Sequence, residues 1–78
     1  MIKNKVLLFG ILADAIGQPF IEVEEAKDTD ALRRQLVVAY PALNMYPYVI
    51  AHNKKVINAN QSIAQGDELA LLPPFAGG

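Results

Sequence analysis

Two unbroken apolar runs stand near the two ends of this chain. Residues 6–9 read Val-Leu-Leu-Phe, and residues 69–72 read Leu-Ala-Leu-Leu. A strand that is apolar at every position is typical of the middle of a sheet, where both faces are covered, and of parallel pairing. The pattern therefore predicts that the first and last strands lie side by side, parallel and central in one sheet.

Between these runs the apolar residues are spaced differently. Residues 20–24 alternate, with Ile21 and Val23 on one side and glutamates on the other. This alternation predicts a half-exposed strand, antiparallel to the first. Before it, residues 11–16 predict one or two helical turns, and Gly17 is well placed to end them.

A longer helix is predicted to begin near Asp28, because the side chain of Asp28 or Thr29 can accept hydrogen bonds from the free N–H groups of a first turn. The apolar positions that recur at helical spacing, and so predict one buried stripe, are Leu32, Leu36, Tyr40 and Leu43. Pro41 disfavours the α conformation for the residue before it, so the regular helix should end near Tyr40.

The remaining elements are short. Residues 48–52 predict a strand that turns at residues 53–55, and residues 56–57 predict a short edge strand. Residues 65–67 predict a turn into the last strand. Strand, short helix, strand, long helix and further strands, in this order, predict an α+β roll with one mixed sheet and one main helix across it.

The end of the chain has a composition of its own. Pro73 and Pro74 remove two backbone donors and hold the chain extended, while Gly77 and Gly78 leave the terminal carboxylate without a nearby side chain. At about 3.3–3.6 Å per residue, six residues can carry that carboxylate about 20 Å from the last strand. We expect this tail, residues 73–78, to deliver a carboxyl group into the active site of another protein. The alternative is a frayed terminus without a function.

Length, charge and the lack of cysteine exclude several kinds of function. The chain has 78 residues, enough for one small domain, which we place over residues 1–72. Its formal net charge is −1 and it has no basic stripe, which argues against nucleic-acid binding. Without cysteine it can form neither a disulfide nor a thiolate metal site. The apolar runs are too short for a signal segment or a membrane span, so we expect a soluble, cytoplasmic protein that binds no membrane.

The side chains offer little chemistry of their own. His52 is the only histidine and Ser62 the only serine, and no nucleophile motif surrounds either. His52 has no cysteine or second histidine to join it around a metal, so we predict no metal site. We expect His52 to be a hydrogen-bonded strand residue and Asp67 to tie down the turn after Gly66. On this reading the protein is not catalytic alone.

The segment from Gly66 to Gly78 carries a more specific pattern: a Gly-Asp-Glu turn, an apolar strand, Pro-Pro, two residues and a terminal Gly-Gly. It resembles the small, sulfur-carrier subunits of molybdopterin synthase, in the MoaD/ThiS-like family. This family is similar in fold to ubiquitin, so the resemblance implies a β-grasp roll, in agreement with the elements above. Two positions depart from the usual pattern, because residues 71–72 lack the frequent aromatic and Phe75 replaces a smaller residue such as valine.

The resemblance implies a mechanism and a set of partners. An E1-like adenylating enzyme would activate Gly78 with ATP, and a sulfur donor protein would convert it to a thiocarboxylate. The large subunit of the synthase would then use this sulfur to build the dithiolene of molybdopterin, within a heterotetramer. Gly77, which has no side chain, would let the tail enter the active site of the large subunit. No cofactor would be bound permanently. The residues expected to contact the partner are Leu71, Leu72, Pro73, Pro74, Phe75 and Ala76.

Two other readings remain open. One is a sulfur carrier for the thiazole of thiamine or for tRNA thiolation, whose relatives also end in Gly-Gly but generally without Pro-Pro two residues before it. The other is a ubiquitin-like modifier joined to protein lysines, or a plain interaction module. Ubiquitin-type tails are basic and flexible, whereas this one is apolar and stiffened by proline.

Overall fold

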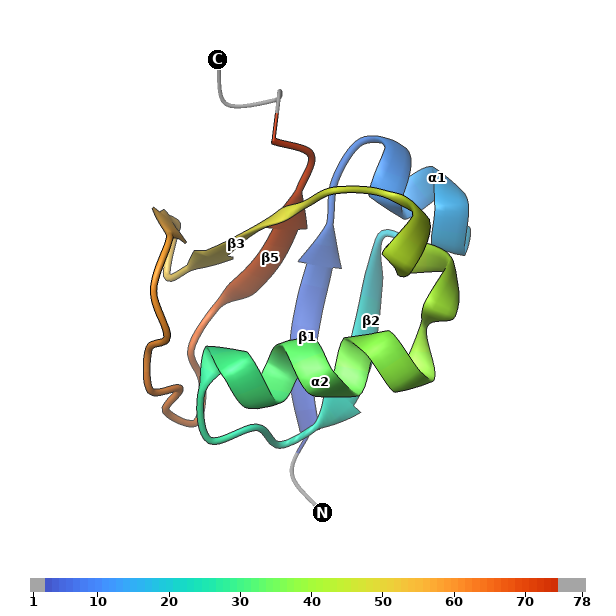
Figure 1. Cartoon of the computed structure of the whole chain (residues 1–78). Helices are drawn as coiled ribbons and strands as arrows, with labels where there is room; N and C mark the ends of the chain where they lie inside the picture. Colours follow the sequence, from blue (N-terminus) through green and yellow to red (C-terminus); the bar gives the residue numbers. More distant parts are fainter. Residues whose placement is uncertain (1–2, 75–78) are drawn as a thin grey trace.

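The described residues of the computed structural model, 3–74, place five strands in one mixed sheet (Figure 1). The strands are β1 (Lys3–Leu8), β2 (Phe20–Glu24), β3 (Val49–His52), β4 (Lys55–Ile57) and β5 (Leu69–Leu72). Their order across the sheet is β2-β1-β5-β3-β4. The helices are α1 (Ile11–Ile16), α2 (Thr29–Ala39) and the short 3-10 helix η1 (Pro41–Met45).

The first and last strands are parallel neighbours, as predicted. Val6 of β1 stands opposite Leu69 of β5, and Leu8 stands opposite Leu71. On either side, β2 pairs antiparallel with β1, and β3 pairs antiparallel with both β5 and β4. Together with the one main helix, this arrangement confirms the predicted β-grasp roll.

The main helix begins and ends where its sequence predicts. The Asp28 side chain accepts a hydrogen bond from the backbone N–H of Ala31 at 2.8 Å, which satisfies one free donor of the first turn. At the other end, Tyr40 leaves the helical conformation and Pro41 opens η1. Gly17 ends α1 in the left-handed region, with φ of 82°.

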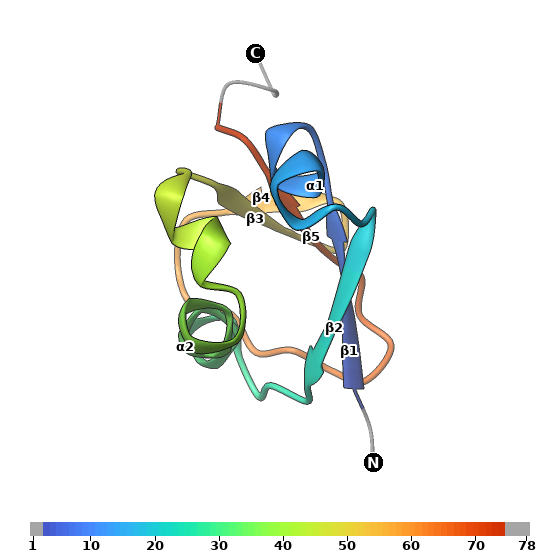
Figure 2. The same cartoon turned by 90° about the vertical axis from the view of Figure 1, so that its right-hand side faces the viewer.

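The core lies between α2 and one face of the sheet, as Figure 2 shows from the side. The predicted stripe supplies its helical half, because Leu32, Leu36 and Leu43 are fully buried and Tyr40 packs against them. The buried sheet residues that meet this stripe are Val6, Leu8, Ile21, Val23, Ile50, Ile57, Leu69 and Leu71.

The opposite face of the sheet is not covered by any element of residues 3–74, so the expectation that β1 is buried on both faces is wrong. Leu7 is only half-buried, and Phe9, just beyond the strand, is 45% exposed. Residues 3–74 form two layers, one sheet and one helical layer, and none of their helices lies on the outer side of the sheet. The apolar run at β1 therefore borders an uncovered apolar face, whereas the run at β5 is buried at Leu69, Ala70 and Leu71 and half-buried at Leu72.

Candidate functional site

The tail begins beside the connection between β1 and α1. The N–H of Phe9 donates a hydrogen bond to the carbonyl of Leu71 at 3.2 Å, which holds the start of this connection against the end of β5. Gly10 follows, and a Cβ at that position would lie 3.0 Å from Cγ of Pro73. The ring of Pro73 therefore rests directly on the Gly10 backbone. In both views the start of the tail and α1 occupy the same end of the sheet (Figures 1 and 2).

An apolar row crosses the uncovered face of the sheet beside this point. The strand register pairs Leu7 with Phe20 on one side and with Ala70 on the other, and continues through Ala51 to Val56. Each of the five strands of the described region thus contributes one apolar residue. Phe20 and Val56 at the two ends are 37% and 63% exposed, whereas the two alanines between them are nearly buried. The small alanines make the middle of the row lower than its ends.

A second apolar row joins the first to the tail. Val49 stands opposite Leu72 across the β3–β5 pair, and Phe9 follows β1 on the other side of Leu72. We call the two rows together the outer apolar face. It consists of Leu7, Phe9, Phe20, Val49, Ala51, Val56, Ala70 and Leu72.

Charged pairs bound the outer apolar face at the end of the sheet away from the tail. Lys5 stands opposite Glu22 and Lys3 opposite Glu24 on β1 and β2. The ammonium group of Lys5 also lies 4.2 Å from the centre of the Phe20 ring, within the range of a cation–π contact. The apolar surface is therefore continuous toward Pro73 and interrupted in the other direction.

The predicted partner-binding residues fall into three groups. Leu72 and Pro73 are half-buried and Pro74 is exposed, so all three offer surface near the tail. Leu71 is fully buried. Because its side chain points into the core, the expectation that Leu71 contacts a partner is corrected. The other expected site residues lie outside the described residues: Phe75, Ala76, Gly77 and Gly78.

Three exposed apolar residues of the outer apolar face, Phe9, Phe20 and Val56, were not expected in the site. Phe20 and Val56 could have been found from the alternation of their strands, because their neighbours Ile21 and Ile57 point into the core. Phe9 was assigned to a buried run, and only the missing second layer reveals its exposure.

His52 forms the hydrogen-bonded strand site that was predicted. Its Nδ1 lies 2.8 Å from Oε1 of Gln61, and its Nε2 lies 2.7 Å from Oδ2 of Asp67. The bond to Gln61, followed by the bond to Asp67, raises the pKa of His52 above its ordinary value. Both ring nitrogens are thus occupied and neither contacts Ser62, so the structure does not bring these two side chains together as a Ser–His–Asp catalytic triad would require. His52 also pairs with Leu69, at the end of β5 opposite the tail.

The Asp67 carboxylate ties down its turn, as predicted. Its Oδ2 accepts a hydrogen bond from the N–H of Ala64 at 2.8 Å as well as contacting His52. The bond from Ala64, followed by that from His52, lowers the pKa of Asp67. The role of this cluster is structural, because it joins β3 to the turn before β5.

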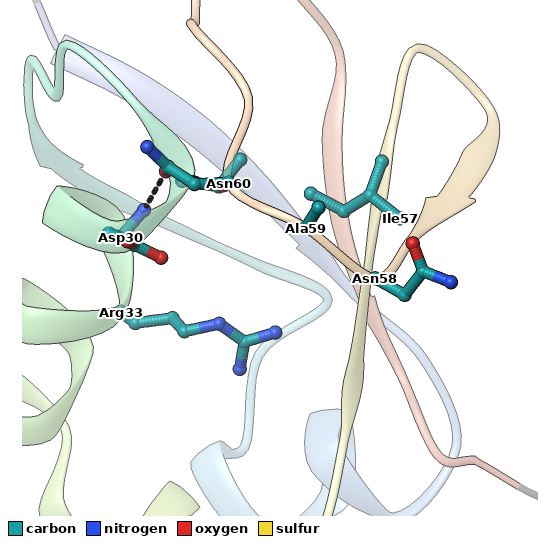
Figure 3. Close-up of a pocket in the computed structure, with 7 residues that line it drawn as sticks. Asp30, Arg33, Ile57, Asn58, Ala59 and Asn60 are labelled. Atoms are coloured by element: carbon teal, nitrogen blue, oxygen red, sulfur yellow. Dashed lines mark hydrogen bonds between the residues drawn. The ribbon is translucent and has the colours of Figure 1, made fainter.

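A small hollow of about 170 Å³ lies between the start of α2 and the segment after β4 (Figure 3). Two of its polar groups bind Asn60, whose Oδ1 accepts hydrogen bonds from the N–H of Asp30 at 2.8 Å and from the hydroxyl of Thr29 at 3.1 Å. In the part of the chain that the structure describes, no three histidine, cysteine or carboxylate side chains are grouped as metal ligands would be. No helix in the same part is long and apolar enough to cross a membrane.

The family of this chain follows from its match to a protein-family model. The model of the ThiS family matches residues 6–78, which include the second half of β1, all of β5 and the whole tail. The chain belongs to the ThiS family.

Relatives of this ThiS-family chain match it over nearly their full length. The molybdopterin synthase sulfur carrier subunit of Chlamydomonas reinhardtii is 31% identical, over 95% of this chain and 96% of its own. The subunit of the same name from Mycobacterium tuberculosis is 32% identical over the full length of both chains.

Solved structures give the same fold. One is a complex of subunits 1 and 2 of the molybdopterin-converting factor from Helicobacter pylori, in which a chain similar to this one has a TM-score of 0.74 and 29% identity. That match covers 99% of this chain and 100% of the other. Another is the small archaeal modifier protein SAMP1 of Haloferax volcanii, with a TM-score of 0.75, 29% identity and coverage of 95% and 97%.

Proposed function

We propose that this chain is the sulfur-carrier subunit of a molybdopterin synthase and carries its sulfur on Gly78 as a thiocarboxylate. The observation that carries the proposal is the position of the tail, which starts at the edge of the outer apolar face. A partner that covers this face also receives the tail that follows Pro73. The full-length similarity to two sulfur carrier subunits supports the proposal.

The chemistry starts from a carboxylate, which must be activated. A free α-carboxyl group has a pKa of about 3.3–3.7 and is ionised and unreactive at neutral pH. In our proposal an E1-like enzyme joins Gly78 to the AMP part of ATP and releases pyrophosphate. A sulfide equivalent from a sulfur donor protein then attacks the acyl carbon and AMP leaves. Glycine at positions 77 and 78 suits both steps, because no Cβ obstructs the attacking atom.

The large synthase subunit is the proposed main partner, and we place it on the outer apolar face. Phe9 and Val56 expose apolar surface that no other described part of the chain covers. Burial of such a side chain contributes roughly 1.5–3 kcal/mol. The Helicobacter pylori complex supports a two-subunit arrangement. We expect two small subunits on a dimer of large ones, in the cytoplasm, where ATP is available.

The test follows sulfur through both steps. The chain is incubated with an E1-like enzyme, ATP and a sulfur source, and its intact mass is measured. We expect one oxygen to be replaced by sulfur, and the loaded chain to support molybdopterin formation by the large subunit. A chain that stays unloaded, or a loaded chain that gives no molybdopterin, contradicts the proposal.

A second candidate function is that of a ubiquitin-like protein modifier. The similarity to the small archaeal modifier protein of Haloferax volcanii favours it. In the same reaction a modifier would form amide bonds between Gly78 and lysines of other proteins. Mass spectrometry of tryptic peptides detects such branched products, and their formation without molybdopterin would favour this second function.

A further inference from the structure

Gly10 combines two features that no other described glycine shares. Its φ of +59° and ψ of −135° lie in a region that residues with a side chain rarely adopt. A Cβ built on it would also meet the tail, at 3.0 Å from Cγ and 3.6 Å from Cδ of Pro73. The φ angles of Gly17 and Gly66 are positive as well, at 82° and 89°, but a Cβ on either would have no neighbour within 4 Å. Backbone conformation alone therefore explains why glycine stands at positions 17 and 66. At position 10 the contact with Pro73 is a second reason.

The backbone around Gly10 is held on both sides. Before it, the N–H of Phe9 is bonded to the carbonyl of Leu71 in β5. After it, the Gly10 carbonyl accepts a hydrogen bond from the N–H of Asp14 at 3.3 Å, within the first turn of α1. A side chain at position 10 would thus be unable to move away easily, and the ring of Pro73 would have to shift instead.

A shift of Pro73 changes the direction of the tail. Carbon atoms pack favourably at about 3.5–4.0 Å, so a Cβ at 3.0 Å would push the ring outward. Pro73 is the first residue after β5, and its ring fixes φ, so the following chain starts from the position of this ring. We propose that Gly10 is a positioning residue for sulfur transfer: its lack of a side chain lets Pro73 seat on the β1–α1 connection and sets the direction in which the tail leaves the domain. This inference rests on the proposed function.

The test compares four variants of the full chain, each preloaded with the thiocarboxylate and mixed with the large subunit in a single-turnover reaction. We expect Gly10→Ala to transfer sulfur at least about tenfold more slowly, because even a displacement of ~1 Å can cost about a hundredfold in rate. Gly17→Ala introduces a Cβ at another positive φ, without a neighbour, and should keep the wild-type rate. Pro73→Ala, alone and combined with Gly10→Ala, completes a double-mutant cycle.

The double variant separates positioning from backbone strain. Without the proline ring the Cβ at position 10 has space, so the double variant should transfer sulfur at the rate of Pro73→Ala alone. If the effect of Gly10→Ala is equally large in the Pro73→Ala background, the strained φ causes it and the inference is overturned. A wild-type rate for Gly10→Ala also overturns it.

A second measurement does not depend on sulfur chemistry. In NMR spectra of the free chain, nuclear Overhauser effects should connect the Gly10 α protons with the ring protons of Pro73, and the corresponding effects should weaken in Gly10→Ala. Their absence in the wild type contradicts the contact itself. If instead the wild-type chain is never loaded with sulfur, the proposed function fails, and the same spectra still decide whether Gly10 seats the tail.

Discussion

Single residues on the outer apolar face can test whether this face is the proposed interface. Phe9 is 45% exposed and lies next to the start of the tail. We expect Phe9→Asp to weaken binding to the large subunit by at least about tenfold, because a charge would be buried in an apolar interface. Titration calorimetry with the purified subunits measures this.

The matched control for Phe9→Asp lies on the other side of the molecule. Val38 of α2 is 82% exposed, and α2 covers the inner face of the sheet. Val38→Asp should therefore bind the large subunit as the wild type does. Equal losses in the two variants would indicate a general effect of charge and would remove the outer apolar face from the proposed interface.

The proposed role of Gly78 as the carrier of sulfur can be tested by changing the length of the tail. Deletion of Gly78 shortens the tail by about 3.5 Å and moves the carboxylate out of register with the activating enzyme. We expect no thiocarboxylate by intact mass and no molybdopterin formation. Addition of one alanine after Gly78 should have the same result, because it places a Cβ beside the reacting carbon. Full activity in either variant would refute Gly78 as the carrier of sulfur.

At the scale of elements, α2 holds the domain together through its buried stripe. Leu36 is fully buried against the sheet. Leu36→Ala should lower the free energy of unfolding by about 2–5 kcal/mol, through lost apolar contact and the cavity left behind. Urea unfolding followed by circular dichroism measures the change, and Val38→Ala on the exposed side of the helix should change it little. A similar loss in both variants would contradict the packing described.

The cluster of His52, Gln61 and Asp67 links β3 to the turn before β5 and makes stability depend on pH. The raised pKa of His52 means that its contribution is complete below its ordinary value of 6.5 and is lost as pH rises through the raised pKa. The lowered pKa of Asp67 means that its contribution is complete above 3.8 and is lost as pH falls through the lowered pKa. The two together stabilise the fold most between pH 3.8 and 6.5.

Urea unfolding across this pH range checks the direction of both effects. In His52→Ala the decline in stability above pH 6.5 should flatten. The variant should still fold and transfer sulfur at the wild-type rate, since His52 lies at the end of β5 opposite the tail. An unchanged decline in the variant would assign the pH dependence to other groups, and a loss of sulfur transfer with a native fold would contradict the proposed mechanism.

At the scale of the whole molecule, sequence periodicity predicted the topology well. The spacing of apolar residues and the residues that begin or end a helix were enough to predict β1, α2 and β5. Asp28, Pro41 and the unbroken apolar runs are local signals, which a sequence shows directly. Which face of the sheet is covered could not be read in this way. An apolar run looks the same whether a second helix or a partner protein covers it. Phe9 was therefore expected to be buried and is exposed, whereas Leu71 was expected to contact a partner and points into the core.

The contact of Gly10 with Pro73 was also invisible to sequence reasoning. The two residues are far apart along the chain and meet only because β1 and β5 are parallel neighbours. A glycine after a strand predicts a turn, but the tertiary contact that makes its missing side chain useful depends on strand order. The sequence therefore predicts the tail from its composition, whereas the contact at the base of the tail depends on topology.

The central position of β5 has a mechanical consequence. The tail continues directly from β5, and β5 is bonded along one edge to β1 and along the other to β3. Tension applied through the tail therefore acts along the strand axis, in shear, and is shared by two ladders of hydrogen bonds at once. A strand at the edge of the sheet would share it with one ladder only. An enzyme that draws in the tail thus pulls on a strand that is anchored along both edges.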